Sequence, residues 1–266
     1  MDLGLKGKVV VVSGAAGKEG SIGETMVRML AAEGAIPVLL DRNERGSIYA
    51  EKFNEKGIDA LFCKIDVTDP AQTEAAVVMI VQKYGRIDAI INNVGINDGV
   101  GLNATFEEFM ESLKLNLASY FLLTKYTLPY LKKSKGVILN IGSKVALTGQ
   151  GGTSGYAAAK GGVLALTREW AVDLIEYGIR SNAIIIAESF TPAYDDWLKT
   201  LPDGNVTLSK INKSIPFESR MTRPEEIANT ALFLISNLSS HTTGQFVFVD
   251  GGYVHLDRAL INEKNI

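Results

Sequence analysis

Tyr156 and Lys160 are the pair of residues in this chain whose types and spacing point most directly to chemistry. A spacing of four residues on a helix places both side chains on one face, where they can reach the same ligand. A free tyrosine has a pKa near ~10, and an adjacent ammonium favours the phenolate and lowers that pKa toward neutrality. The pair can therefore exchange a proton with a substrate oxygen, although many such pairs are only neighbours on a helix surface.

The position of Ser143 favours a catalytic role for Tyr156 and Lys160 over a chance pairing on a helix surface. It comes thirteen residues before Tyr156 and directly after residues 136–141 and Gly142, an apolar stretch predicted to be a buried strand. From the end of that strand its hydroxyl can hold a substrate oxygen against Tyr156. The alanines at 157–159 leave room for a bound ring nearby. The three side chains together predict acid–base catalysis on a hydroxyl or carbonyl group.

Asn116 is the fourth candidate catalytic residue. It lies in residues 106–132, a stretch with helical spacing that is expected to form two helices end to end. In one interpretation it holds a water molecule that links Lys160 to solvent, so that protons can leave the site. In the other, it is a buried asparagine that only satisfies hydrogen bonds within the fold.

A glycine-rich turn follows the first predicted strand, residues 8–13, and leads into a helix predicted over residues 21–33. Glycines let the backbone approach a pyrophosphate, and the helix N-terminus offers free N–H groups and a positive dipole. The alternative is a purely structural tight turn. The first interpretation places a dinucleotide phosphate at four residues: Gly14, Ser21, Ile22 and Gly23.

Polar residues at the ends of the next strands complete a predicted dinucleotide site. Asp41 follows residues 36–40 and can accept hydrogen bonds from an adenosine ribose while repelling a 2′-phosphate. Because Asp41 comes first at the strand tip, NAD is the expected cofactor. Arg42 could instead bind that phosphate, which leaves NADP as the alternative. Carboxyl ends of parallel strands face one crevice, which adds the residues after the third and fourth strands: Asp66, Val67, Asn93 and Gly95.

The elements that must position these residues alternate between short β-branched runs and longer amphipathic stretches. This order is typical of a parallel sheet covered by helices on both faces, so we predict a Rossmann-like, doubly wound α/β fold of about seven strands. Residues 1–266 are expected to form one domain. Residues 189–215 lack clear periodicity and are expected to be a substrate-loop insertion over the carboxyl edge of the sheet. The remaining predicted strands are 60–65, 89–92, 180–186 and 246–249, and the remaining helices start near Pro70 or span 154–177 and 224–234.

The composition excludes several other classes of protein. The formal net charge of −3 and the lack of a dense basic cluster give no reason to expect nucleic acid or an anionic membrane as partner. Cys63 is the only cysteine, and His241 and His255 have no partners at metal-binding spacing, so no metal site is expected. No apolar run reaches the ~18–20 residues of a membrane helix, and the first residues do not form a signal peptide. A cytoplasmic protein is therefore expected.

The motifs together resemble the short-chain dehydrogenase/reductase family from about Lys8 to Gly252. The resemblance implies a seven-stranded sheet, a dimer or tetramer, and a catalytic tetrad of Asn116, Ser143, Tyr156 and Lys160. It also implies that Lys160 binds the nicotinamide ribose and that Thr191 bonds the carboxamide. The matching pieces are Ser13-Gly14 to Gly23, Asp66-Val67, Asn92-Asn93-Val94-Gly95, Asn116, Ser143, Tyr156 with Lys160, Asn182 and Val249-Asp250-Gly251-Gly252.

Three departures from the family pattern affect the site. The glycine turn is about three residues longer than usual, with Ser21 where the middle glycine is expected, so the phosphate contacts are the least defined. Val94 replaces an alanine, and Ile186-Ala187 replaces the usual Pro-Gly. An extended first loop also occurs in enoyl reductases of this superfamily. Their lysine lies further than four residues from the tyrosine, so the spacing here argues against that activity.

Several shorter stretches are similar to bacterial L-fucose and related sugar dehydrogenases, a subgroup of this family. They surround Asn97, Gln150 and Glu188, and they continue through Leu166-Thr167-Arg168-Glu169-Trp170 and residues 251–258. Polar groups that follow strand ends suit a polyhydroxylated substrate, because a steroid or acyl chain would leave them unpaired. Alternatively, these are solvated loop positions. The predicted substrate-binding residues are Asn97, Ser143, Gln150, Tyr156, Glu188 and Trp197.

Three functions remain open from the sequence. The first is an NAD-dependent dehydrogenase of a sugar such as an L-fucose-like aldose. The second is an NADP-linked 3-oxoacyl or other carbonyl reductase that uses the same tetrad in reverse. The third is a dinucleotide-binding regulator without turnover, against which the intact tetrad argues.

Overall fold

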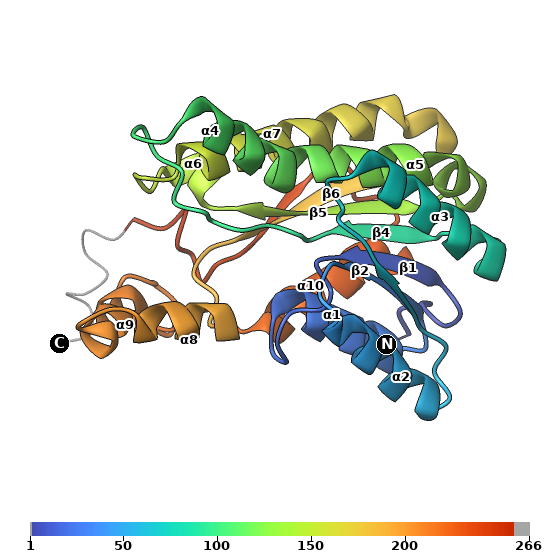
Figure 1. Ribbon diagram of the computed structural model, residues 1–266, viewed down its shortest axis with the longest axis horizontal. Coiled ribbons are helices and arrows are strands. Elements are labelled where there is room, and N and C mark those ends of the chain that lie inside the picture. Colours follow the sequence, from blue (N-terminus) through green and yellow to red (C-terminus); the bar gives the residue numbers. More distant parts are fainter. Residues whose placement is uncertain (1, 258–266) are drawn as a thin grey trace.

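One seven-stranded parallel sheet runs through the computed structural model, which describes residues 2–257 (Figure 1). The strand order is β3-β2-β1-β4-β5-β6-β7, so the direction of winding reverses between β1 and β4. This confirms the predicted Rossmann-like sheet, in which ligands bind at the point of reversal. The strands are β1 (Val9–Ser13), β2 (Ile36–Asp41), β3 (Leu61–Lys64), β4 (Ala89–Asn92), β5 (Val137–Ser143), β6 (Arg180–Ile186) and β7 (Phe246–Val249).

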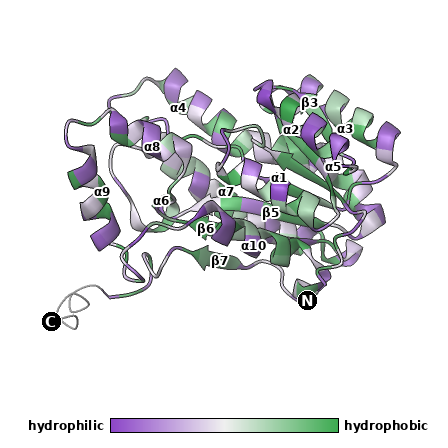
Figure 2. Ribbon diagram, turned by 90° about the horizontal axis from the view of Figure 1, so that it is seen from below, coloured by the Kyte–Doolittle hydropathy of each residue, from purple (hydrophilic) through white to green (hydrophobic). Residues whose placement is uncertain are grey.

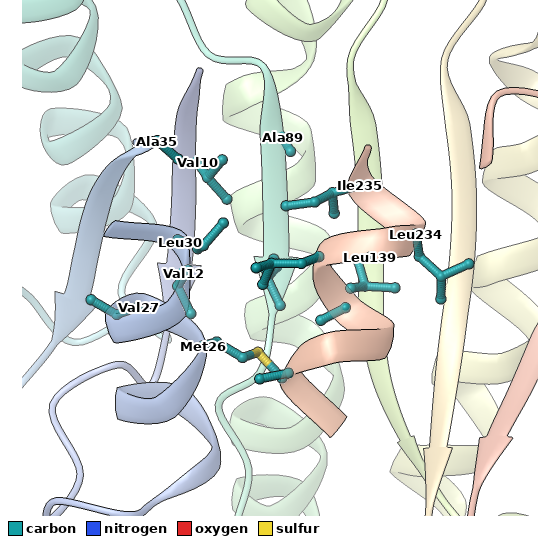
Figure 3. Packing of buried hydrophobic residues seen from close by; sticks show 14 of the residues in the cluster. Val10, Val12, Met26, Val27, Leu30, Ala35, Ala89, Leu139, Leu234 and Ile235 are labelled. Atoms are coloured by element: carbon teal, nitrogen blue, oxygen red, sulfur yellow. The ribbon is translucent and has the colours of Figure 1, made fainter. Parts of the chain in front are cut away.

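Helices cover both faces of the sheet, which is why its central strands are apolar throughout. Every residue of β1, β4 and β5 is buried, as expected of strands enclosed on two sides. One face packs against α1 (Ile22–Ala32) and α10 (Pro224–Ile235), where Met26 and Leu30 meet Val12 and Leu139 (Figure 3). The other face packs against three helices: α3 (Pro70–Tyr84), α5 (Ser119–Ser134) and α7 (Ser154–Asp173).

The long helical stretch after β4 is two helices joined end to end, as its spacing predicted. α4 (Phe106–Leu113) and α5 are separated by a single π-helical turn, Lys114–Ala118. Wide turns of this kind occur often at functional sites. Asn116 lies in the turn and is fully buried.

The fold contains helices that the sequence pattern did not predict. α2 (Arg45–Glu55) is strongly polar and buries only Gly46 and Ala50. The predicted insertion 189–215 holds α8 (Pro192–Lys199) and α9 (Gly204–Lys213), and α9 has no fully buried residue. These three helices are polar on average and bury few residues, so their few apolar residues did not stand out as helices in the sequence. The remaining short helices are α6 (Val145–Thr148) and the 3₁₀ turns Ile175–Tyr177 and Asn237–Ser239.

α8 and α9 lie at the end of the molecule to which the carboxyl ends of the central strands point (Figure 1). Figure 2 shows hydrophobic residues along the sheet and many hydrophilic residues on α4 and α9. Thr191 starts α8, since its side chain accepts a hydrogen bond from the Tyr194 backbone N–H, and a proline follows at the first helical position. Within residues 2–257, every helix is too short or too polar to cross a lipid bilayer.

Candidate active site

A cavity of about 550 Å³ opens at the carboxyl ends of the central strands, where the winding of the sheet reverses. Residues from the glycine turn, from the ends of β2 and β4 and from α7 line it. All thirteen residues that the sequence predicted for cofactor binding are among them: Gly14, Ser21, Ile22, Gly23, Asp41, Arg42, Asp66, Val67, Asn93, Gly95, Tyr156, Lys160 and Thr191.

The glycine turn is held tightly against the loop after β4. Gly14 has a left-handed backbone (φ +67°), and a Cβ atom there would lie 2.8 Å from Val94 Cα. A Cβ atom on Gly23 would lie 2.1 Å from the Gly14 carbonyl oxygen. The Asn93 side-chain amide donates to the Ser13 and Gly14 carbonyls, both at 3.0 Å. Larger residues at either glycine would therefore force these closely packed backbone segments apart.

The lengthened part of the turn suits an anionic group. Ser21 precedes α1 as its N-cap residue, yet its hydroxyl caps no N–H and has no hydrogen-bond partner among residues 2–257. A Cβ atom on Gly17 would come within 2.3 Å of that hydroxyl. A free hydroxyl at the positive end of a helix, beside backbone that only glycine permits, is a suitable environment for a dinucleotide phosphate.

Asp41 connects the end of β2 to the glycine turn. One carboxylate oxygen accepts from the Ala16 backbone N–H at 2.8 Å and the other from the Asn43 N–H at 2.9 Å. Arg45 donates to the Ala16 carbonyl at 2.9 Å. The carboxylate is thus held in the cavity wall, and Arg42 lines the same cavity.

Lys160 is buried in α7 with its ammonium turned toward the sheet. Only 2% of its surface is exposed, and its Nζ donates to the Ile141 carbonyl at 2.8 Å and to the Tyr120 hydroxyl at 2.9 Å. The Nζ lies 5.6 Å from the centre of the Tyr156 ring. The Ser143 hydroxyl lies close enough to Tyr156 to lower the pKa of the phenol, so three of the four predicted catalytic residues converge.

The pKa values of this pair differ from the expectation that the ammonium lowers the pKa of Tyr156. Burial raises the pKa of Tyr156 to about 12, the nearby Ser143 hydroxyl opposes this, and Asp98 raises it further. Burial also lowers the pKa of Lys160 to about 7. The expectation was therefore wrong, because Nζ bonds to Tyr120 and Ile141 and burial has the largest effect on the pKa of Tyr156.

The side chain of Asn116 is occupied by the backbone around it. Its Oδ1 accepts from the Ile96 N–H at 2.8 Å, and its Nδ2 donates to the Ile96 and Ser112 carbonyls, both at 3.1 Å. These bonds fix the loop after β4 against the π-helical turn. They favour the structural interpretation of the amide group, and a water link from Asn116 to Lys160 stays a proposal.

The predicted substrate residues divide into two groups. Glu188 pairs with Lys144 and accepts from the Tyr194 hydroxyl at 2.9 Å, and the Trp197 ring meets the Tyr194 ring edge-on at 5.1 Å. Lys144 and Glu188 lie near the end of β5, because Lys144 follows Ser143 and Ser143 lies opposite Ile186 in the β5–β6 register. In contrast, Asn97 and Gln150 are exposed loop residues. Asn97, Gln150, Glu188 and Trp197 do not line the 550 Å³ cavity.

Three residues of the site were missed from the sequence: Tyr120, Lys144 and Tyr194. Two of them had a usable signal, since Tyr120 comes four residues after Asn116 and Lys144 directly follows Ser143. In the part of the chain that the structure describes, no three His, Cys, Asp or Glu side chains are grouped as metal ligands.

This site, with a serine, a tyrosine and a buried lysine beside a dinucleotide-sized cavity, is that of a nicotinamide-dependent oxidoreductase. A family profile described as enoyl-(acyl carrier protein) reductase matches residues 14–254. The chain belongs to the short-chain dehydrogenase/reductase family and is an NAD(P)-dependent oxidoreductase.

Two curated relatives have different activities. The L-fucose dehydrogenase of Oryctolagus cuniculus is 36% identical over 92% of this chain and 84% of its own length. The 3-oxoacyl-[acyl-carrier-protein] reductase FabG of Thermotoga maritima is 35% identical over 94% of this chain and 99% of its own. These near-equal identities do not separate a sugar from an acyl substrate.

Two solved structures match over nearly the whole chain. The Cj0485 dehydrogenase is 43% identical, with a TM-score of 0.93 over 98% of this chain and 99% of its own. The L-sorbose reductase of Gluconobacter frateurii, solved with NADPH and L-sorbose, is 26% identical, with a TM-score of 0.90 over 97% of this chain and 100% of its own. This fold therefore accommodates a sugar and a phosphorylated nicotinamide cofactor in a relative.

Proposed function

We propose that this protein is an NAD-dependent dehydrogenase of an L-fucose-like aldose, which it oxidises at a ring hydroxyl, with a lactone as the product if the anomeric hydroxyl reacts. The observation that carries this proposal is the Glu188 carboxylate, held by Lys144 and Tyr194 beside the strand that ends in Ser143. Although these groups are paired with one another, a carboxylate and an ammonium keep further acceptors and donors. The hydroxyls of a polyhydroxylated ligand could use them, and an acyl chain could not.

In the direction of oxidation, Ser143 holds the sugar hydroxyl and the phenolate of Tyr156 takes its proton. The C–H bond at the carbon that bears this hydroxyl breaks as the C=O bond forms, and the hydrogen leaves that carbon as hydride. Bound NAD supplies the hydride acceptor. In its charged form Lys160 attracts the phenolate, with Nζ 5.6 Å from the ring centre, but this attraction does not overcome the effect of burial. Lys160 is also the residue that would hold the nicotinamide ribose. In reduction, Tyr156 returns the proton to the carbonyl oxygen.

An NADP-linked carbonyl or 3-oxoacyl reductase is the second candidate. It is supported by the FabG relative and by Arg42, which lines the cavity next to Asp41 and could pair with a 2′-phosphate. Initial rates with a panel of aldoses and 3-oxoacyl thioesters, each measured with both cofactors, separate the two. The proposed function requires the highest kcat/KM for an aldose with NAD. A higher value for an acyl thioester with NADPH would overturn it.

Asp41→Ala is expected to shift the cofactor preference from NAD toward NADP. The substitution removes the carboxylate that repels a 2′-phosphate and leaves Arg42 in place. The ratio of kcat/KM for the two cofactors measures the shift. Because Asp41 also accepts from Ala16 and Asn43, Asp41→Asn serves as the control that retains a side-chain acceptor without the charge. A wild type that already prefers NADP would contradict the assignment.

Glu188→Ala is expected to lower kcat/KM for the aldose by about one to two decades, because a hydrogen bond to a charged group contributes ~1.5–3 kcal/mol. NAD affinity should stay nearly unchanged, since Glu188 lies outside the cofactor cavity. A deoxy sugar without the contacted hydroxyl provides the matched test. Wild type should discriminate against it and the variant should not, and equal discrimination by both would show that Glu188 only holds Lys144 and Tyr194.

We further propose a homo-oligomer, either a dimer or a tetramer, in a reducing cytoplasm. Phe106 on α4 and Phe121 on α5 are 71% and 49% exposed, which gives these neighbouring helices apolar surface for a second subunit. Cys63 is buried and unpaired, as is common for proteins kept under reducing conditions. Light scattering of the purified protein measures the oligomeric state.

A further inference from the structure

Tyr120 is a completely buried tyrosine that contacts the catalytic lysine from another helix. It lies on α5, one turn after Asn116, with 1% of its surface exposed. Its hydroxyl accepts from Lys160 Nζ at 2.9 Å and donates to the Ile141 carbonyl at 3.2 Å. Lys160 donates to the same carbonyl at 2.8 Å. The Tyr120 hydroxyl, the Lys160 ammonium and the Ile141 carbonyl of β5 thus form a closed triangle of hydrogen bonds.

This triangle accounts for most of the hydrogen-bonding capacity of the buried ammonium. An ammonium has three N–H donors and no acceptor, and two of the three are directed to Tyr120 and Ile141. The third is left for the cavity, since Lys160 lines it and a Cβ atom on Gly95 would lie 3.3 Å from Nζ. A buried charge is tolerated only where its donors are satisfied, so Lys160 depends on the Tyr120 oxygen.

We propose that Tyr120 is a positioning residue for Lys160, whose phenol oxygen holds the ammonium in place and in its charged form at the cavity wall. The inference rests on the proposed hydride transfer only through Lys160 and does not depend on which substrate is turned over. Tyr120 lies behind Lys160 and is absent from the cavity lining, so it acts through Lys160 and not on the substrate.

The direction in which the pKa of Lys160 changes in Tyr120→Phe follows from the groups around its ammonium. Burial already lowers the pKa of Lys160 to about 7. Among the described residues, the titratable groups that face Lys160 are Tyr120 from α5 and Tyr156 from α7, whose ring centres lie 4.8 and 5.6 Å from Nζ. Asp98, from the loop after β4, acts on Tyr156. Removing an acceptor from the ammonium disfavours its charged form and lowers the pKa of Lys160 further. Less positive charge then remains beside Tyr156.

The first test is a direct titration of Lys160 in the cofactor-free enzyme. With lysine labelled at the ε-carbon, the Lys160 NMR resonance, assigned by its loss in Lys160→Met, should titrate near neutrality in wild type. In Tyr120→Phe it should titrate at least about one pH unit lower. Tyr126→Phe, on the same helix but without a bond to Lys160, is the control and should titrate like wild type. An unchanged Lys160 titration in Tyr120→Phe would overturn the proposal.

The second test is kinetic and uses whichever alcohol or sugar the enzyme oxidises fastest. Tyr120→Phe should lower kcat at pH 7 about ten-fold and move the rising limb of the oxidation profile to higher pH. The same substitution in a Lys160→Met background should have no further effect. A purely structural role predicts a lower melting temperature without either change. If no sugar is oxidised, the proposed function fails, whereas the titration of Lys160 still decides the role of Tyr120.

Discussion

Tyr156→Phe is expected to lower turnover by at least ~10²-fold, the usual contribution of a positioned acid–base group. The substitution removes only the phenol oxygen, which lies near Ser143 and must exchange the proton with the substrate. The ring still packs in the cavity wall beside Lys160, so cofactor affinity should change little. Steady-state kcat and a fluorescence titration with NADH measure the two quantities separately.

The pH dependence of the wild type provides the control for this assignment. Burial raises the pKa of Tyr156 to about 12, so the phenol is protonated at neutral pH in the cofactor-free chain. Oxidation needs the deprotonated form and reduction the protonated one, hence the oxidation rate should rise with pH and the reduction rate should fall. Tyr156→Phe should lose both dependences. Near wild-type turnover in the variant would show that another group transfers the proton.

The residues that line the cavity could be predicted from the sequence because they occupy positions that the topology defines. Strands buried on both faces read as continuous apolar runs, so the ends of β1, β2 and β4 are visible in the sequence. The carboxyl ends of parallel strands face the same crevice. Placing Gly14, Asp41 and Asn93 at three strand ends therefore also places them around one cavity, as the structure shows.

The partners of the charged residues could not be predicted in the same way. Lys160 bonds to Tyr120, forty positions earlier, and Lys144 bonds to Glu188, forty-four positions later. Such pairs depend on side-chain packing between elements, which neither spacing nor periodicity encodes. For this reason the expected lowering of the Tyr156 pKa by Lys160 was wrong. Asn97 and Gln150 also follow strand ends, but their loops extend into solvent.

Gly23→Ala is expected to lower kcat/KM for the cofactor by about 10²-fold, the scale associated with a ~1 Å misplacement of a binding element. A Cβ atom at this position would lie 2.1 Å from the Gly14 carbonyl oxygen and 2.8 Å from the Asn93 amide nitrogen. Neither atom can move freely, because Gly14 leads out of β1 and Asn93 bonds to the Ser13 and Gly14 carbonyls. The start of α1 must therefore shift away from the turn.

The matched control is Gly161→Ala on α7, where a Cβ atom would meet nothing within 4 Å. Replacing a glycine inside a helix by alanine favours folding by roughly 0.5–1 kcal/mol, so this variant should be at least as stable as wild type and bind NADH equally well. Gly23→Ala should instead lower the melting temperature, since overpacking typically costs ~1–3 kcal/mol. A loss of stability alone does not weaken NADH binding to the enzyme that remains folded. An NADH dissociation constant measured well below the melting temperature therefore separates destabilisation from weaker binding. A wild-type dissociation constant for Gly23→Ala would mean that the cofactor phosphates do not depend on the contact between Gly23 and Gly14.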